Sequence, residues 1–356
     1  MTQQKKKINK NVIWTLISLL LAVLTIRIVL KQNSEMSLNE LIEVISGSDK
    51  KYMIAAMVSA LLYIVFEAQA LGVIINRAGC GRVRLNGILY SASDMYFSAI
   101  TPSSTGGQPA SAFFMMLDGI SGGIATAALI LNILMYTLSI ITLGFVSAFI
   151  MPEAFGSFST VSKVFIIGGF IILSGLSAVS VVLLKKDSLI FRPLTAIINK
   201  LYEKKIIRQR DSRIARLEKI RNDYRKCSDI ISNSKRILFY TFFLNLIQRV
   251  SQIIVPVLVY NSLGGKSSES VSVFIRQCLI TIGFNYVPVP GGMGISDYLM
   301  IDGFTEIMVE KMAYSVELIS RGITFYICVL ISGLITLVGY CIKRRVSPRF
   351  NREEQK

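Results

Sequence analysis

Histidine is absent from the 356 residues of this sequence. Its absence excludes Ser-His-Asp triads, histidine-ligated metal sites and histidine proton relays. The five cysteines are scattered from Cys80 to Cys341 and form no Cys-x-x-Cys pair, so neither a zinc site nor a disulfide framework is predicted. We therefore expect no metal, no cofactor and no enzymatic centre of these kinds.

Charged residues are also scarce. They make up 17% of the chain, against 52% hydrophobic residues, whereas soluble proteins carry about 25% charged residues. A helix needs roughly 20 mostly apolar residues to cross a bilayer. Six segments meet this requirement most clearly: 12–31, 52–75, 123–150, 162–184, 237–260 and 318–342. The sequence predicts an all-α polytopic membrane protein with six full spans.

The net charge of +17 raises the question of nucleic-acid binding, but its distribution indicates a membrane topology instead. With the N-terminus placed in the cytoplasm, cytoplasmic segments hold 29 of the 39 Lys and Arg residues and outside segments hold six. This asymmetry follows the positive-inside rule and predicts that both termini are cytoplasmic. We expect a multi-pass protein of the cell membrane that contacts anionic lipid and binds no nucleic acid.

Two segments, 86–118 and 270–309, contain apolar arms that are too short to cross the bilayer. The arms flank Thr-Pro-Ser-Ser-Thr-Gly-Gly-Gln-Pro at 101–109 and Asn-Tyr-Val-Pro-Val-Pro-Gly-Gly-Met-Gly at 285–294. Irregular backbone at membrane depth needs surrounding protein or a water-filled cavity. We therefore predict two re-entrant helix hairpins, and the charge asymmetry requires that they enter from opposite faces.

The two predicted hairpins also resemble each other. In each, a Gly-Gly pair is followed by Asp-Gly, 11 residues on in the first and 10 in the second. Opposite orientation and this match together predict an inverted repeat, in which transporters place a binding site near the bilayer midplane. The predicted organisation is a first membrane half at 1–184, a basic cytoplasmic helical linker at 185–236, a second membrane half at 237–342 and a basic tail at 343–356.

The linker at 185–236 carries apolar residues at helical spacing among many Lys and Arg residues. We expect a solvated helical hairpin, with a helix lying on the anionic inner leaflet as the alternative.

The broken loops have the backbone of a binding site. Glycine allows close approach and positive φ, and a half-helix that begins near Gln108 leaves N–H groups at its tip, where anions bind. Two such tips meeting at mid-membrane would hold a lipid phosphate; the alternative is that glycine and proline only permit close packing. The candidate residues of the two loops are Thr101, Pro102, Ser104, Thr105, Gly106, Gly107, Gln108, Pro290, Gly291, Gly292 and Asp297.

Three ionisable residues within the apolar segments, Glu67, Asp94 and Arg249, complete the candidate site. A charge at membrane depth costs about 2.5–3.5 kcal/mol on insertion scales, so it usually faces a cavity. We expect Arg249 to hold phosphate. The acids, Asp297 included, would contact the headgroup or take up a coupling proton. The alternative is direct pairing of Glu67 or Asp94 with Arg249.

The loop at 101–109, Val-Pro-Gly-Gly-Met-Gly-Ile-Ser-Asp at 289–297 and the basic linker resemble the membrane domain of lysylphosphatidylglycerol synthase/flippase proteins. These are the multiple peptide resistance factors and their stand-alone relatives. The resemblance covers nearly the whole chain and implies a lipid-translocating domain, which in full-length members moves aminoacylated phosphatidylglycerol to the outer leaflet. Full-length members also carry a soluble aminoacyltransferase domain. Only 14 residues follow the last predicted span, so we expect a stand-alone member.

Gln108 and Ser111 stand where many family members have Glu and Arg, and Asp297 stands where Glu is common. The aminoacyl-lipid substrate is therefore not carried over residue by residue. We expect a flippase-like transporter, not an enzyme, for a phospholipid or polyprenyl-linked lipid. The alternative is a membrane partner that binds lipid and presents it to a separate synthase or glycosyltransferase. A homo-oligomer is compatible with either function.

Overall fold

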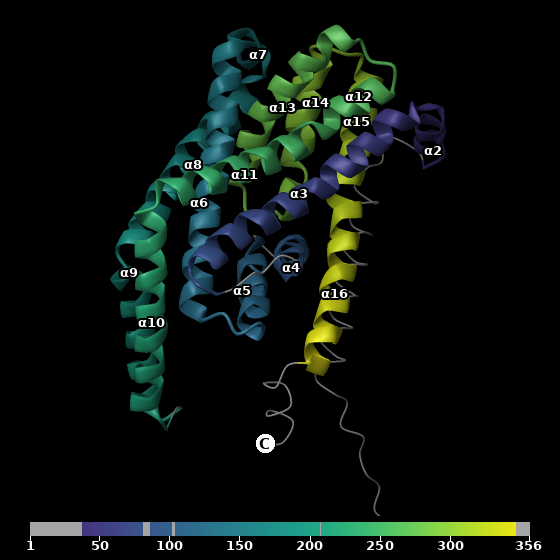
Figure 1. The fold of residues 1–356 in the computed structure, drawn as a ribbon. Helices are drawn as coiled ribbons and strands as arrows, with labels where there is room; N and C mark the ends of the chain where they lie inside the picture. The colour runs from purple at the N-terminus through teal and green to yellow at the C-terminus, as the bar shows by residue number, and fades with distance from the viewer. Residues whose placement is uncertain (1–37, 81–85, 102–103, 207, 347–356) are drawn as a thin grey trace, which may run out of the picture.

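The computed structural model describes residues 38–80, 86–101, 104–206 and 208–346. The predicted span at 12–31 lies outside these residues. Within them every regular element is a helix (Figure 1), and five stretches are long and apolar enough to cross a membrane. These are α3 (Lys50–Arg77), α6 (Gly122–Ile150), α8 (Thr160–Lys185), α11 (Lys235–Ile253) joined to α12 (Val255–Ser262), and a last span from Glu310 to Arg344. The all-helical, multi-pass membrane architecture is confirmed.

Several spans begin close to the residue that hydropathy predicts, and each of these begins at a helix cap. Asp49 accepts the N–H of Lys51 at 2.9 Å at the start of α3, and Ser159 and Ser234 cap α8 and α11 in the same way. Such caps satisfy amides that have no partner within the helix. The last span is the exception, because it begins at Glu310, eight residues before the predicted start. Its first section, α15 (Glu310–Arg321), carries charged residues, so hydropathy does not assign it to the span. A π-helix (Gly322–Ile327) and α16 (Cys328–Val346) follow.

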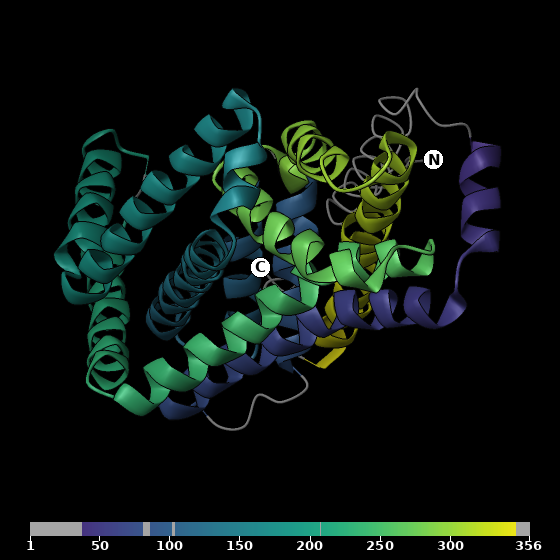
Figure 2. The same ribbon diagram turned by 90° about the horizontal axis from the view of Figure 1, so that it is seen from above.

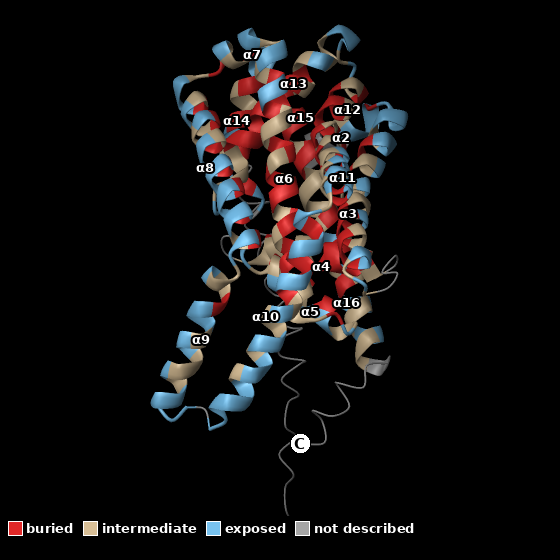
Figure 3. Cartoon of the chain, turned by 60° about the vertical axis from the view of Figure 1, so that its left-hand side comes forward, coloured by how far each residue is buried: buried red, intermediate tan, exposed pale blue. Residues whose placement is uncertain are grey.

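Two pairs of short helices lie among the spans. α4 (Asn86–Ile100) packs on α5 (Gly107–Leu117), and α13 (Ser270–Asn285) packs on α14 (Ile295–Thr305). The arms have 15 and 11 residues in the first pair and 16 and 11 in the second. The α4–α5 pair lies in the half of the bundle nearer α10, and the α13–α14 pair lies in the half nearer α7 (Figures 1 and 3). The two pairs therefore occupy opposite ends of the bundle.

The packing partners of the two pairs correspond. α4 packs against α16, the last span, whereas α13 packs against α6. Each first arm also contacts the span before it, and each second arm contacts the span after it. The spans α3 and α11 pack directly on each other. Each half of the chain thus packs the first arm of its short-helix pair against a span of the other half.

Close backbone approach holds this arrangement together. At Gly169 on α8, a Cβ would stand 2.2 Å from the carbonyl oxygen of Ile282 on α13, so the two helices touch through glycine, as small residues allow in membranes. Buried residues gather at the centre of the bundle, and α8 is largely exposed along its outer side (Figure 3). The exposed side chains there, such as Val164 and Ile171, are apolar, as a surface facing lipid requires.

The basic linker forms α9 (Ser188–Glu203) and α10 (Arg210–Ser232) at one side of the bundle (Figure 2). Tyr224 donates to the carbonyl oxygen of Leu183 at 2.8 Å, which ties α10 to the end of α8. Asp187 is ion-paired with Arg221 and Arg225. Burial raises the pKa of Asp187, but the two guanidinium groups outweigh burial and lower the pKa overall. The linker is helical in α9 and α10, and α10 is fixed to the spans. Two short α-helices remain in the described residues: α2 (Leu38–Gly47), which precedes α3, and α7 (Pro152–Ser157), which joins α6 to α8.

Candidate functional site

A cavity of about 460 Å³ lies where the tips of the two short-helix pairs approach each other. Ser104 and Gln108 border it from the first tip, and Val289, Gly291 and Gly292 border it from the second. Its walls come from the four helices of the two pairs and from α3, α6, α8, α11, α12 and the last span. The volume falls within the roughly 300–1,000 Å³ range of ligand pockets.

Arg249 of α11 is the main positive charge on the cavity wall. Its side chain is 2% exposed and lies between the rings of Tyr63 and Tyr136, with the guanidinium carbon 4.6 and 4.1 Å from the ring centroids. Nη1 donates to Gln252 at 3.0 Å, but Nε and Nη2 are buried without a hydrogen-bond partner. A guanidinium held by two rings at the edge of a cavity, with two donors that have no partner among the described residues, can bind an anion.

Glu67 and Asp94 form an acidic cluster on the same cavity. Glu67 is 5% exposed and accepts hydrogen bonds from Ser91 at 2.8 Å and from Gln248 at 3.3 Å. Asp94 accepts from Gln108 at 2.7 Å, and its carboxyl group also interacts directly with that of Glu67. Neither acid forms an ion pair with Arg249. The direct pairing considered from the sequence is therefore not what the structure contains.

The first tip is built by internal hydrogen bonds around Gly106 and Gly107. Thr101 accepts the N–H of Gly106 at 2.9 Å, and a Cβ on Gly107 would stand 2.0 Å from Oδ1 of Asp94. Glycine is thus required at 107 for Asp94 to reach the start of α5. Thr101, Thr105, Gly106 and Gly107 support the tip without bordering the cavity, and Pro102 lies outside the described residues.

The second tip turns through glycines that adopt positive φ. The angles are +63° at Gly291, +65° at Gly292 and +80° at Gly294, a region that side chains with a Cβ rarely occupy. A Cβ on Gly291 would also stand 2.5 Å from the ring of Phe325 on the π-helix. The backbone of Pro290 belongs to the same short helical turn. The glycines therefore allow the tip to pack against the π-helix of the last span.

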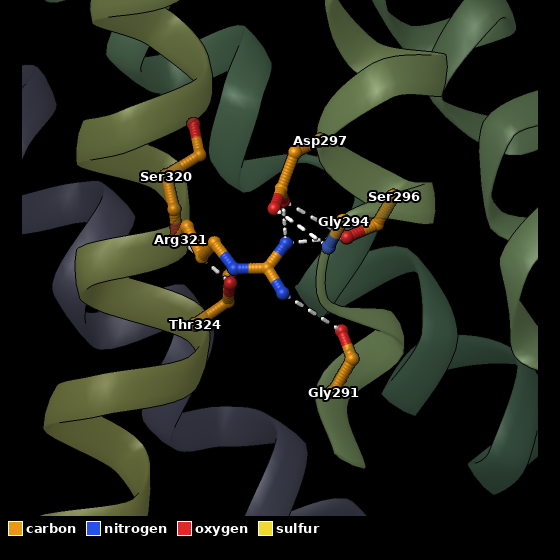
Figure 4. Close-up of polar contacts among 7 residues, drawn as sticks. All are labelled: Gly291, Gly294, Ser296, Asp297, Ser320, Arg321 and Thr324. Carbon is orange, nitrogen blue, oxygen red and sulfur yellow. Dashed lines mark hydrogen bonds and ion pairs between the residues drawn. The ribbon is translucent and has the colours of Figure 1, made fainter. Parts of the chain in front are cut away.

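Asp297 of the second tip already has strong partners within the protein (Figure 4). It accepts the N–H of Gly294 at 2.9 Å, so it caps its own helix, and it is ion-paired with Arg321. Arg321 also donates to Ser296 and to the carbonyl oxygen of Gly291 at 3.2 Å. The carboxylate thus occupies the helix start that the sequence suggested for a ligand's phosphate.

Other buried polar atoms around the cavity also have no partner in the described part of the chain. They are Oε1 of Gln108, Oε1 of Gln277 and Oγ of Ser320. More than about 90% of buried polar groups in proteins are hydrogen-bonded, so this set indicates a place for a polar ligand or for water. Within the described ranges, no group of three or more Cys, Asp and Glu residues is placed to hold a metal ion.

The sequence matches a family model over residues 12–332, and the family is described as the lysylphosphatidylglycerol synthase TM region. The chain belongs to this family. The match includes both tips, Arg249 and the linker, and it confirms the resemblance carried by the two loops. No match was found among curated proteins or among solved structures. A lysylphosphatidylglycerol synthase TM region is the membrane part of a lipid-associated family.

Two polar residues of α5 differ in their surroundings. Gln108 uses its amide N–H to bind Asp94; a Glu there would place a carboxyl group beside that of Asp94. Ser111 is fully buried, and its hydroxyl has no partner in the described part of the chain.

Arg321 is the cavity residue whose burial the sequence did not predict. Hydropathy puts it near the edge of the segment 318–342, where an arginine can reach the membrane surface. In the structure it is 7% exposed and borders the cavity. The only sequence signal was the charged section that begins at Glu310, which extends the last span and moves Arg321 deeper into the bundle.

Proposed function

We propose that this protein moves a phosphate-bearing membrane lipid between leaflets and binds its headgroup in the cavity between the two tips. The observation that carries the proposal is Arg249, a fully buried guanidinium with two unused donors on the cavity wall. Burying a charge is costly unless it is compensated, and an anionic headgroup would compensate this one. Membership of a lipid-associated family supports the same conclusion.

The membrane arrangement belongs to the proposal. Six spans and two re-entrant hairpins, 86–118 and 270–309, would form an inverted repeat around the cavity. The near-equal arm lengths, the location at opposite ends of the bundle and the reciprocal packing on α16 and α6 support this arrangement. The membrane halves 1–184 and 237–342 would then be the two repeats, with 185–236 as the cytoplasmic linker and both termini in the cytoplasm.

Each group around the cavity has a proposed role. Arg249 binds the phosphate, while Glu67, Asp94 and Gln108 meet the polar part of the headgroup. Asp297 and Arg321 are engaged with each other, so they shape the second tip rather than contact lipid. Movement of one hairpin relative to the other would open the cavity first toward one leaflet and then toward the other.

The test uses the purified chain in liposomes with fluorescent phosphatidylglycerol in both leaflets and a quencher outside. Wild-type protein should accelerate loss of the protected fluorescence, and Arg249→Gln should abolish the acceleration. Arg236→Gln is the matched control, because Arg236 lies on the same helix, exposed and away from the cavity; it should retain wild-type rates. Equal rates for the two variants would contradict the assignment of the cavity.

A protein that presents lipid to a separate synthase is the other outcome of this experiment. Wild-type protein would then bind phosphatidylglycerol in an Arg249-dependent manner without any acceleration of exchange. Binding is therefore measured on the same preparations, and binding without exchange would replace the flippase proposal by the presenting function.

A further inference from the structure

The cavity holds two charge centres that face each other without pairing. On one side, Arg249 keeps Nε and Nη2 without a partner. On the other side, Glu67 and Asp94 interact with each other and receive hydrogen bonds only from neutral groups. The titratable groups that act on the acidic pair and on Arg249 are these three residues together with Tyr63 and Tyr136.

Contact between two carboxyl groups in a buried site has a chemical consequence. A hydrogen bond between carboxyl groups contains a proton, so the pair carries one negative charge while it is joined. Loss of that proton leaves two carboxylates side by side, which repel each other strongly where water is excluded. The second carboxylate can form an ion pair with the guanidinium of Arg249, whose two unused donors match a carboxylate as well as a phosphate.

We propose that Glu67 and Asp94 hold a shared proton whose binding favours binding of an anionic headgroup to Arg249. The proposal deepens the headgroup site and rests on the function proposed above. With the proton bound, Arg249 is available to a phosphodiester; without it, a carboxylate competes for the guanidinium. Only an O–H bond changes: the carboxyl pair gives its proton to a water molecule on the side to which the cavity is open, which leaves a second carboxylate and a hydronium ion. Because linkage is reciprocal, the bound headgroup also retains the proton.

The absence of an acid at position 108 fits this arrangement. Gln108 donates its amide N–H to Asp94 and leaves Oε1 without a partner on the cavity. An amide cannot exchange a proton with the pair, so the titrating unit has two members. Each bound headgroup is therefore coupled to at most one proton.

The test measures binding of short-chain phosphatidylglycerol to the full chain in detergent between pH 5.5 and 8.5. Its phosphodiester keeps one charge over this range, so a pH dependence reports the protein. Affinity should fall by about tenfold from the acidic to the alkaline end, within the range of typical coupling between sites. Glu67→Gln and Asp94→Asn should each reduce the change to less than about twofold, while Asp229→Asn, an exposed acid on α10, keeps the wild-type slope.

Calorimetry in buffers of different ionisation enthalpy adds a measurement on the unmodified protein. At the middle of the transition, wild-type protein should take up about half a proton per lipid bound, the largest uptake that a tenfold change in affinity allows. Glycerophosphoglycerol, the headgroup without acyl chains, should show the same proton uptake at lower affinity. Binding with no proton uptake and no pH dependence would overturn the coupling while leaving the headgroup site intact. No lipid binding at any pH would overturn the proposed function itself.

Discussion

The two hairpin tips carry related sequences but different chemistry. At the first tip, Asp94 is hydrogen-bonded by the neutral groups of Gln108 and Ser98 and remains open to the cavity. At the second tip, Asp297 is ion-paired with Arg321 and caps its own helix. A buried acid without a counter-ion is free to respond to a ligand or a proton, whereas an ion-paired acid fixes a conformation. The first tip is therefore the responsive one, and the second is the anchored one.

The same contrast extends to the matched Asp-Gly positions. Asp118 follows the end of α5, accepts a hydrogen bond from Tyr90 at 2.5 Å and pairs with Lys343 of the last span. Asp302 lies inside α14 and accepts the N–H of Ser159 at 3.0 Å. The Gly-Gly pair begins α5 directly but precedes α14 by three residues, so nearly equal spacing in the sequence puts the two acids about one helical turn apart along their helices. Each acid nevertheless ties its hairpin to another helix.

The largest expected effect comes from removing the ion pair between Arg321 and Asp297. Arg321→Met should destabilise the protein by about 3 kcal/mol, because the partly buried Asp297 would lose its counter-ion. Ser296 and the carbonyl oxygen of Gly291 would also lose their donor. The loss is measured by thermal unfolding in detergent. If the pair serves only as an anchor, the double variant Arg321→Met with Asp297→Leu should recover most of the stability and retain Arg249-dependent lipid binding.

Recovery of stability without recovery of lipid binding would contradict the division between the tips, because it would make Arg321 or Asp297 part of the headgroup site. Lys311→Met controls for the removal of a charge on α15, since Lys311 is exposed near its start. It should change stability by less than about 0.5 kcal/mol.

The next effect concerns the geometry of the responsive tip. Gly107→Val would place side-chain atoms where Oδ1 of Asp94 and Oγ of Ser98 now lie, 2.0 and 2.1 Å from the added Cβ. We expect a cost of about 1–3 kcal/mol from overpacking and complete loss of lipid exchange. Gly72→Ala on α3, where a Cβ meets no atom within 4 Å, should leave both stability and exchange unchanged. Wild-type exchange in Gly107→Val would disprove the role of this contact.

These contacts also show how far the sequence could predict the molecule. Apolar length predicted four of the described spans to within two residues at either end, and Gly-Gly and Pro predicted both broken loops. Hydropathy could not predict the depth of Arg321, because a buried ion pair and a surface arginine look alike in a sequence. Nor could it predict that Asp297 caps its own helix while Asp94 does not. Such choices depend on which side chains meet across helices distant in the chain.

A third expected effect tests the charge balance of the responsive tip. Gln108→Glu would add a carboxyl group beside Asp94 and remove the amide N–H that Asp94 now accepts. Like charges in a buried site repel, so phosphatidylglycerol binding at pH 7.5 should weaken by about tenfold. Adding Ser111→Arg, one turn along the same helix, supplies a cation at i+3 and should restore part of the affinity. Failure of the pair to improve on Gln108→Glu alone would show that charge balance does not control this tip.

The smallest effect is expected in the linker, which belongs to neither tip. Asp187→Asn removes the partner of Arg221 and Arg225 and should loosen α10 by about 0.5–1 kcal/mol, as for other partly exposed ion pairs. Because the pKa of Asp187 is lowered in the folded protein, this stabilisation is complete above the ordinary carboxyl pKa and is lost as pH falls through the lower folded value.

The thiol of Cys227 reports the loosening of α10, since Cys227 is 1% exposed and burial raises its thiol pKa to about 12. Its alkylation at pH 7, followed by mass spectrometry, should become about two- to fivefold faster in Asp187→Asn, while lipid exchange stays at wild-type rates. A matching loss of lipid exchange would mean that the linker also controls the first tip, through Ser121 at the start of α6, which donates to Asp223 of α10 at 2.5 Å.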